Sequence, residues 1–179
     1  MTRRPATRWT LAVAVLSVLA ISGCGSQPEA AERTAVNVYA VGDCVEIPPT
    51  EPGSTTAKAV KAVKAPCSND PSYTVGATAD ASGECPSVEY QRLPEQSADP
   101  STSRLCLVPN LLADHCYVLD MPIGLVQKAD CAARGQQGLL VQVTQRLDVR
   151  DQSACPSATG HYAWPYPSPA RTYCTQTLF

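Results

Sequence analysis

Short runs of β-branched and aliphatic residues, bounded by Pro, Gly, Ser and Asp, dominate the hydrophobic pattern of this 179-residue chain. Such runs are typical of β-strands, whereas the periodicity of an amphipathic helix is weak throughout. The runs predict strands over residues 36–45, 59–65, 72–79, 104–108, 116–119, 124–129, 139–147 and 171–177.

The segments between these runs predict loops and two short helices. Residues 48–56 and 96–103 are rich in Pro, Ser and Thr, which is typical of loops. The sequence Cys-Pro-Ser occurs at Cys85 and again at Cys155. Because proline is tolerated in the first turn of a helix, we expect one short helix at each place.

The first 23 residues have the layout of an export signal. Arg3, Arg4 and Arg8 precede an uncharged apolar run over residues 11–21. This run is too short to cross a bilayer, which takes about 20 apolar residues.

Ile21-Ser22-Gly23-Cys24 follows the apolar run and is similar to the lipobox of bacterial lipoproteins. The similarity implies cleavage after Gly23 and attachment of diacylglyceryl to the Cys24 sulfur, with further acylation of the new amino terminus as an option. Two acyl chains are enough for stable anchoring to the cell membrane on its extracytoplasmic side. The alternative is an ordinary secretory signal in which Cys24 is incidental. Residues 24–35 are then a polar tether.

Charge makes nucleic acid an unfavourable partner. Removing residues 1–23 removes three of the 14 Lys and Arg residues and none of the 16 Asp and Glu residues, which leaves a formal charge of −5. No basic stripe with interleaved aromatic residues occurs in the remainder, so we expect no binding to nucleic acid.

Eight cysteines remain when Cys24 is assigned to the lipid, and an even number in an exported chain predicts disulfides. They are Cys44, Cys67, Cys85, Cys106, Cys116, Cys131, Cys155 and Cys174. No CxxC pair occurs, so redox exchange and paired zinc knuckles lack their usual signature. We expect neither a metal nor a cofactor.

The neighbours of these cysteines indicate an internal duplication. Cys67 and Cys131 both follow Lys-Ala-x, and Cys85 and Cys155 both begin Cys-Pro-Ser. Between them, VGAT from Val75 aligns with VQVT from Val141. The competing interpretation is coincidence in an alanine-rich chain.

The duplication predicts an α+β, mainly β architecture with two lobes at residues 36–110 and 114–179. Each lobe is a small antiparallel sheet with a short helix. Lobes of this size have barely sufficient cores and are commonly stapled. Three pairings are open within each lobe; we favour Cys44 with Cys67, Cys85 with Cys106, Cys116 with Cys131, and Cys155 with Cys174.

An aromatic and proline-rich segment, HYAWPYPSPARTY from His161, is the one specific binding candidate. Tyr162, Trp164 and Tyr166 alternate, so an extended chain places them on one side, where they can stack on sugars or contact a partner. The alternative is that the same rings cover the core. Both histidines, His115 and His161, are expected to be surface or hydrogen-bonded side chains.

The lipobox together with GDCV, KAPCSNDPSYTVGAT, LCLVPN, DHCY and YAWPYPSPARTYC resembles the mycobacterial LppU-type lipoproteins over essentially the whole length. The GDCV start, at Gly42, is also similar to small actinobacterial envelope domains, although Ser68 stands where those domains often have Pro-His. The resemblance implies an envelope lipoprotein and carries no activity over to particular residues.

Two functions follow as hypotheses. The first is a non-enzymatic lipoprotein that binds an envelope protein or a cell-wall glycan, because no catalytic motif such as GxSxG, SxxK or HExxH occurs. The second is an envelope hydrolase with an unrecognised site at the interface of the lobes. A cleft with two or more carboxylates would favour the hydrolase.

Overall fold

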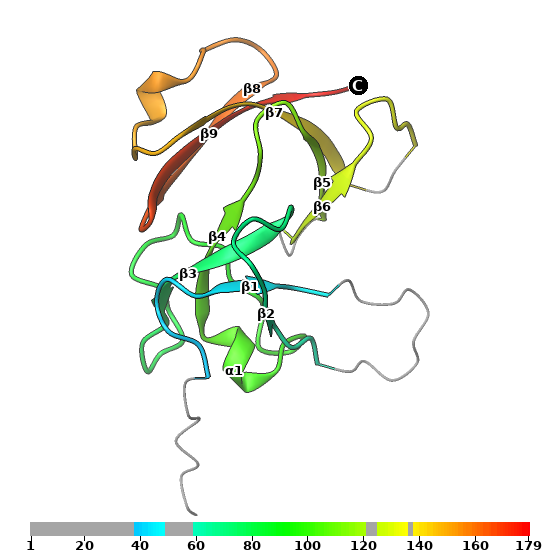
Figure 1. Cartoon of the computed structure of the whole chain (residues 1–179). Helices are drawn as coiled ribbons and strands as arrows, with labels where there is room; N and C mark the ends of the chain where they lie inside the picture. The colour runs from blue at the N-terminus through cyan, green and yellow to red at the C-terminus, as the bar shows by residue number, and fades with distance from the viewer. Residues whose placement is uncertain (1–37, 49–58, 121–124, 136–137) are drawn as a thin grey trace, which may run out of the picture. The chain divides into compact units, whose positions relative to one another are not determined.

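The computed structural model describes residues 38–48, 59–120, 125–135 and 138–179. These residues form two antiparallel sheets, so the chain is mainly β as predicted (Figure 1). The predicted signal, Cys24 and the predicted tether lie outside the described residues.

The first sheet has four strands in the order β2-β1-β3-β4. They are β1 (Cys44–Glu46), β2 (Val63–Lys64), β3 (Ser72–Thr78) and β4 (Leu105–Asn110). The second sheet has five strands in the order β6-β5-β7-β9-β8. They are β5 (Cys116–Asp120), β6 (Leu125–Ala129), β7 (Leu139–Leu147), β8 (His161–Pro167) and β9 (Ala170–Thr177).

Four disulfides staple these sheets, in the pairing that the sequence favoured. Cys44 bonds to Cys67 and Cys85 to Cys106 in the first lobe; Cys116 bonds to Cys131 and Cys155 to Cys174 in the second. Their sequence separations are 23, 21, 15 and 19 residues. Closing a loop of this length stabilises by about 3 kcal/mol in the chain-entropy model.

Six predicted strands agree with the structure to within about two residues at each end, and two were too long. Residues 36 and 37 of the predicted strand over 36–45 lie outside the described residues; from residue 38 on, the strand begins only at Cys44, because the chain turns at Gly42, whose φ is +94°. The turn is closed by the Asp43 side chain, which accepts from the Ala40 N–H at 2.8 Å. The run over 59–65 contributes only the two residues of β2 and an isolated bridge at Val60.

The predicted helices at the Cys-Pro-Ser stretches are wrong. The single short α-helix of the described residues, α1 (Pro100–Ser103), lies in the segment that was assigned to a loop. Asp99 caps it by accepting from the Ser101 N–H, and Pro100 occupies its first turn. In the second lobe a 3₁₀ turn, η1 (Gln152–Ala154), ends just before Cys155.

Strand β8 was expected to be extended but was not among the predicted strands. It contains two prolines, which cannot donate to a sheet and are therefore confined to edge strands. The structure agrees, since β8 is the last strand of the second sheet (Figure 1). Proline within a run counts against a strand in sequence analysis, and for this reason β8 was not predicted as a strand.

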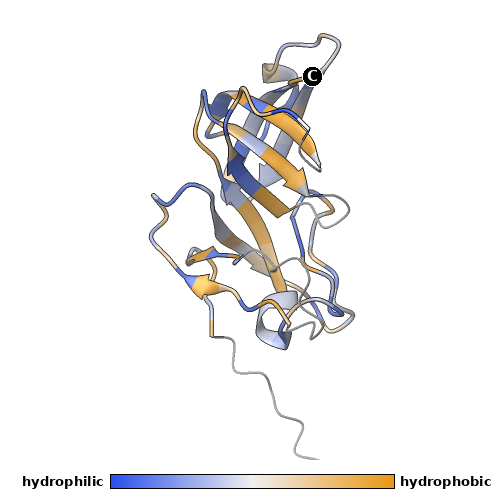
Figure 2. Ribbon diagram, turned by 90° about the vertical axis from the view of Figure 1, so that its right-hand side faces the viewer, coloured by the Kyte–Doolittle hydropathy of each residue, from blue (hydrophilic) through white to orange (hydrophobic). Residues whose placement is uncertain are grey.

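The hydrophobic cores of the two lobes exchange residues. Leu125, on β6 of the second sheet, is buried in the core of the first lobe. Val108, near the end of the first lobe, and Leu111, just after it, are buried in the core cluster of the second lobe, and Tyr90 packs against that cluster. Figure 2 shows hydrophobic residues on strands of both sheets.

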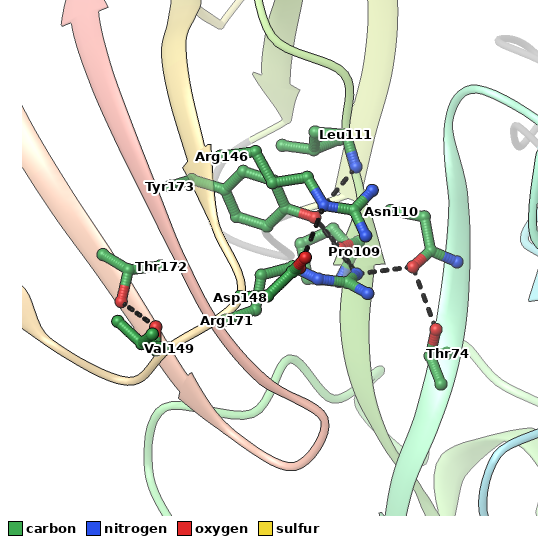
Figure 3. Close-up of polar contacts among 10 residues, drawn as sticks. All are labelled: Thr74, Pro109, Asn110, Leu111, Arg146, Asp148, Val149, Arg171, Thr172 and Tyr173. Carbon is green, nitrogen blue, oxygen red and sulfur yellow. Dashed lines mark hydrogen bonds and ion pairs between the residues drawn. The ribbon is translucent and has the colours of Figure 1, made fainter.

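The connection between the sheets is held by two buried side chains of β9. Arg171, only 7% exposed, donates through Nη1 to the Pro109 carbonyl at 3.1 Å and to Asn110 Oδ1 at 2.6 Å (Figure 3). The Tyr173 hydroxyl donates to the same carbonyl at 2.6 Å and accepts from the Leu111 N–H at 3.1 Å. These bonds fix the segment over residues 109–111 against the second sheet.

Glycine at position 76 lets the tip of the β8–β9 hairpin approach the first sheet. Gly76 lies at the irregularity between Val75 and Ala77 in β3. A Cβ there would come within 2.0 Å of the Ser168 carbonyl oxygen and 2.5 Å of the Tyr90 ring. Contacts this short with backbone do not occur, so the position requires glycine.

We predict that Gly76→Ala lowers the free energy of unfolding by about 3 kcal/mol, because the hairpin must move away from β3. Gly135→Ala is the control: no atom lies within 4 Å of its Cβ position, and only its φ of +72° opposes alanine, at a cost of about 1–2 kcal/mol. Chemical denaturation measures both. A smaller loss in Gly76→Ala than in Gly135→Ala would contradict the close approach of the hairpin.

Candidate functional site

A cleft of about 540 Å³ lies between residues of the two sheets. Its size is in the range of small-molecule and peptide pockets. The first lobe contributes the end of β1, one residue of β2 and the start of β3; the second contributes β6. The lining residues are Glu46, Ile47, Pro48, Val63, Asp70, Pro71, Tyr73, Leu125, Val126, Gln127 and Lys128.

Asp70 is the polar centre of this interface. Its side chain is 9% exposed and belongs to the first lobe, but three donors of the second lobe bind it. His115 Nδ1 lies 2.6 Å from Oδ2, Lys128 Nζ lies 2.8 Å from Oδ2, and the Tyr117 hydroxyl donates to Oδ1. One carboxylate therefore ties the first lobe to both β5 and β6.

The Asp70 carboxyl is held in its ionised form. Burial alone would raise its pKa, but hydrogen bonds from Lys128, Tyr117 and His115 together outweigh burial and bring the pKa below its ordinary value. Burial and the hydrogen bond to Asp70 raise the pKa of the Tyr117 hydroxyl, which keeps it a donor. The cluster is a fixed ion pair at neutral pH rather than a proton donor.

The lysines of the two Lys-Ala-x-Cys stretches have different partners. Lys64 lies 2.8 Å from Asp43 within its own lobe, whereas Lys128 lies 2.8 Å from Asp70 across the interface. The similar sequences gave no sign of this difference, because Asp70 and Lys128 are 58 positions apart. This is the part of the site that the sequence missed.

Two further contacts shape the cleft. The Tyr73 hydroxyl, on β3, accepts from the Val126 N–H of β6 at 2.9 Å. Burial raises the pKa of Tyr73 to about 12, so this phenol stays neutral. Half-buried Glu46 accepts from Asn69 Nδ2 at 2.5 Å, and no Lys or Arg among the described residues lies within ion-pair distance of it.

No residue of the aromatic segment predicted as a binding candidate lines this cleft. Tyr166 is 4% exposed and packs edge-to-face on Tyr173 with ring centroids 6.1 Å apart. Trp164 is half-buried against the same core cluster, and only Tyr162 is largely exposed, at 52%. The exposure of the three rings therefore increases along β8 from Tyr166 through Trp164 to Tyr162.

The remaining sequence candidates divide clearly. The eight cysteines predicted to form disulfides do so, and none of them lines the cleft. His115 is a hydrogen-bonded side chain of the Asp70 cluster, and His161 begins β8. Over the described ranges, no group of three or more His, Cys, Asp or Glu side chains is placed to hold a metal ion. No helix in that same part of the chain has the length and apolar character needed to cross a bilayer.

Comparison with known proteins does not identify a relative: no family model, curated protein or solved structure matches the chain.

We predict that Asp70→Asn lowers the free energy of unfolding by roughly 1–3 kcal/mol at pH 7, because half-exposed Lys128 loses its counter-ion beside a buried amide. Since the folded pKa of Asp70 lies below the unfolded value, its contribution is complete above about pH 4. It is lost as the pH falls through the folded pKa. The difference between wild type and variant should therefore shrink below pH 4 in denaturation curves.

Asp148→Asn is the matched control for that variant, because its exposed carboxylate lies 3.6 Å from Arg146 within one lobe. We expect this variant to lose less than about 1 kcal/mol of the free energy of unfolding. Equal losses in the two variants would show that the Asp70 cluster is no more than a surface ion pair.

We predict that Tyr166→Ala costs about 3–5 kcal/mol of stability, as expected for a buried aromatic side chain. Tyr162→Ala should change stability by about 0.5 kcal/mol or less, because half of its surface is already in water. Denaturant unfolding of both variants tests the gradient along β8, and similar losses would contradict it.

Proposed function

We propose that this protein is exported, anchored to the cell membrane by a lipid on Cys24, and uses the cleft between its sheets to bind a partner in the cell envelope. The partner classes are an envelope protein or a cell-wall glycan, and no reaction is assigned. The family proposed is the mycobacterial LppU-type lipoproteins, supported by the residues quoted above.

One observation carries the location. The chain has nine cysteines, and the eight at positions 44 and beyond are all bonded in four disulfides. Disulfides persist in oxidising compartments outside the cytoplasm. The single cysteine left over is Cys24, which stands where the lipobox pattern has its modified residue.

The geometry of the cleft favours binding over catalysis. Its walls belong to two stapled sheets, so little conformational entropy remains to be lost when a partner binds. Most of its lining is apolar, with a few polar groups held in place by hydrogen bonds. This combination is typical of recognition sites.

A hydrolase is the second candidate, because the cleft contains two carboxylates, Glu46 and Asp70. Asp70 argues against it: the carboxyl accepts from three donors, and its lowered pKa makes it a poor general acid near neutral pH. Turnover of a cell-wall substrate that is lost in Glu46→Gln, with the fold intact, would favour the hydrolase instead.

We also propose that the two lobes arose by duplication. The strand order β2-β1-β3-β4 has its counterpart in β6-β5-β7-β9, with β8 added at the edge. Cys44 and Cys116 each begin the second strand of that order and bond to a cysteine shortly after the edge strand.

The hydrogen bonds around the bulges support one register for the two proposed copies. The Val75 N–H donates to the Asp43 carbonyl at 2.8 Å, and the Val143 N–H donates to the His115 carbonyl at 3.0 Å. Both valines precede an irregularity in their strand. In the proposed duplication Val75 would then correspond to Val143, two residues from the Val141 of the sequence alignment.

We predict that Cys24→Ala, expressed as the full chain in an actinobacterial host, no longer incorporates an alkyne-labelled fatty acid and is recovered unprocessed or in the soluble fraction. Ser22→Ala is the control, because it keeps a small residue before the cleavage site and should remain labelled and membrane-bound. A processed Cys24→Ala protein that still partitions with membranes would contradict the anchor.

A further inference from the structure

The edges of the two sheets differ in whether they can accept another strand. An exposed edge presents unpaired backbone N–H and C=O groups to any extended chain. Four strands lie at edges: β2 and β4 in the first sheet, β6 and β8 in the second. Two of them, β4 and β8, are closed, and β2 is only two residues long.

Each closed edge has its own cause. On β4, Leu107 exchanges both backbone hydrogen bonds with Gln91, at 2.8 and 2.9 Å. On β8, Pro165 and Pro167 lack N–H groups. Strand β2 is not closed but offers little length for pairing, because the Ala62 N–H just before it already donates to Thr102 Oγ1 at 2.8 Å.

Strand β6 keeps part of its edge open beside the cleft, at Lys128, because Tyr73 already occupies the N–H of Val126. Since Val126 donates its N–H away from β5 to Tyr73, the alternation of an antiparallel pair also turns the N–H and C=O of Lys128 away from β5. No described residue hydrogen-bonds to these two groups. Leu125 to Lys128 line the cleft, so the open part of this edge lies beside it.

The charge of the cleft indicates what kind of strand it accepts. Asp70 and Lys128 neutralise each other, which leaves the Glu46 carboxylate without a cationic partner among the described residues. Residues 24–179 also carry a formal charge of −5, which attracts cations at longer range. A basic side chain of the ligand would pair with Glu46.

We infer that the cleft binds an extended peptide segment of a partner protein, which adds as a strand to β6 and places a basic side chain against Glu46. The apolar lining, with Ile47 and Val63 on the first-lobe side, receives the alternate side chains of that segment. This inference rests on the proposed binding function and selects a peptide over a glycan as its ligand.

The test uses the disulfide-intact protein, residues 25–179, and fluorescein-labelled Lys-Val-Lys-Val-Lys-Val amide as the probe. Fluorescence polarisation should show saturable binding, and the amide resonance of Lys128 should shift in NMR spectra. Two further probes carry N-methyl groups on either the lysines or the valines. Strand addition uses the N–H groups of one edge of the peptide, so one methylated probe should bind as the parent does and the other at least tenfold more weakly.

The charge is tested separately. Glu46→Gln keeps an acceptor for Asn69 but should weaken binding of the lysine peptide roughly fivefold, the size expected for an exposed ion pair. Glu84→Gln, which alters an exposed carboxylate outside the cleft, should leave the affinity unchanged. Equal effects of the two variants would overturn the pairing with Glu46.

Failure of the inference differs from failure of the proposed function. If neither methylated probe binds more weakly than the parent, or if the parent does not bind, strand addition is wrong. In that case we would titrate a soluble N-acetylglucosamine oligomer. If it shifts the NMR resonances of the cleft residues, the ligand is a glycan and not a peptide, and the proposed binding function stands. Fatty-acid labelling of Cys24 reports on the anchor independently of every probe.

Discussion

The buried carboxylate of Asp70 is the contact on which the arrangement of the two sheets depends. A carboxylate that is 9% exposed is costly unless it is paired and hydrogen-bonded, and all three of its donors come from the other lobe. Separating the lobes would leave Asp70 and Lys128 without their partners. Together with the Tyr73–Val126 hydrogen bond and Leu125 in the core of the first lobe, this pairing holds β6 beside the first sheet and so forms the cleft.

The disulfides stabilise each lobe, whereas the shared core connects one lobe to the other. Lobes as small as residues 36–110 and 114–179 bury too little apolar surface to be robust alone. The four disulfides restrict each lobe's unfolded chain, but they do not connect the lobes. Two sets of contacts connect the lobes. Leu125 of the second lobe packs in the first core, and Val108 and Leu111 pack in the second. Arg171 and Tyr173 also hydrogen-bond to the segment that connects the sheets.

The sequence predicted what depends on local pattern. Short runs of β-branched and aliphatic residues located most strands. The order of the cysteines gave the pairing because each bond closes a loop of 15 to 23 residues between one cysteine in a strand and one outside the strands. The helix was misplaced although Asp99-Pro100 carried a capping signal, and β8 was hidden by its prolines. The cleft could not be predicted, because Glu46, Asp70 and Lys128 meet only through the packing of one lobe on the other.

Native-state hydrogen exchange tests most directly whether the two lobes form one cooperative unit. Three amide protons report on it: Leu107 in the first sheet, Val143 in the second, and Val126, which donates to Tyr73 between them. If the account is correct, their opening free energies converge on one value as denaturant is added, and Asp70→Asn lowers all three together. Separate values for Leu107 and Val143, with Val126 exchanging well before either, would contradict it.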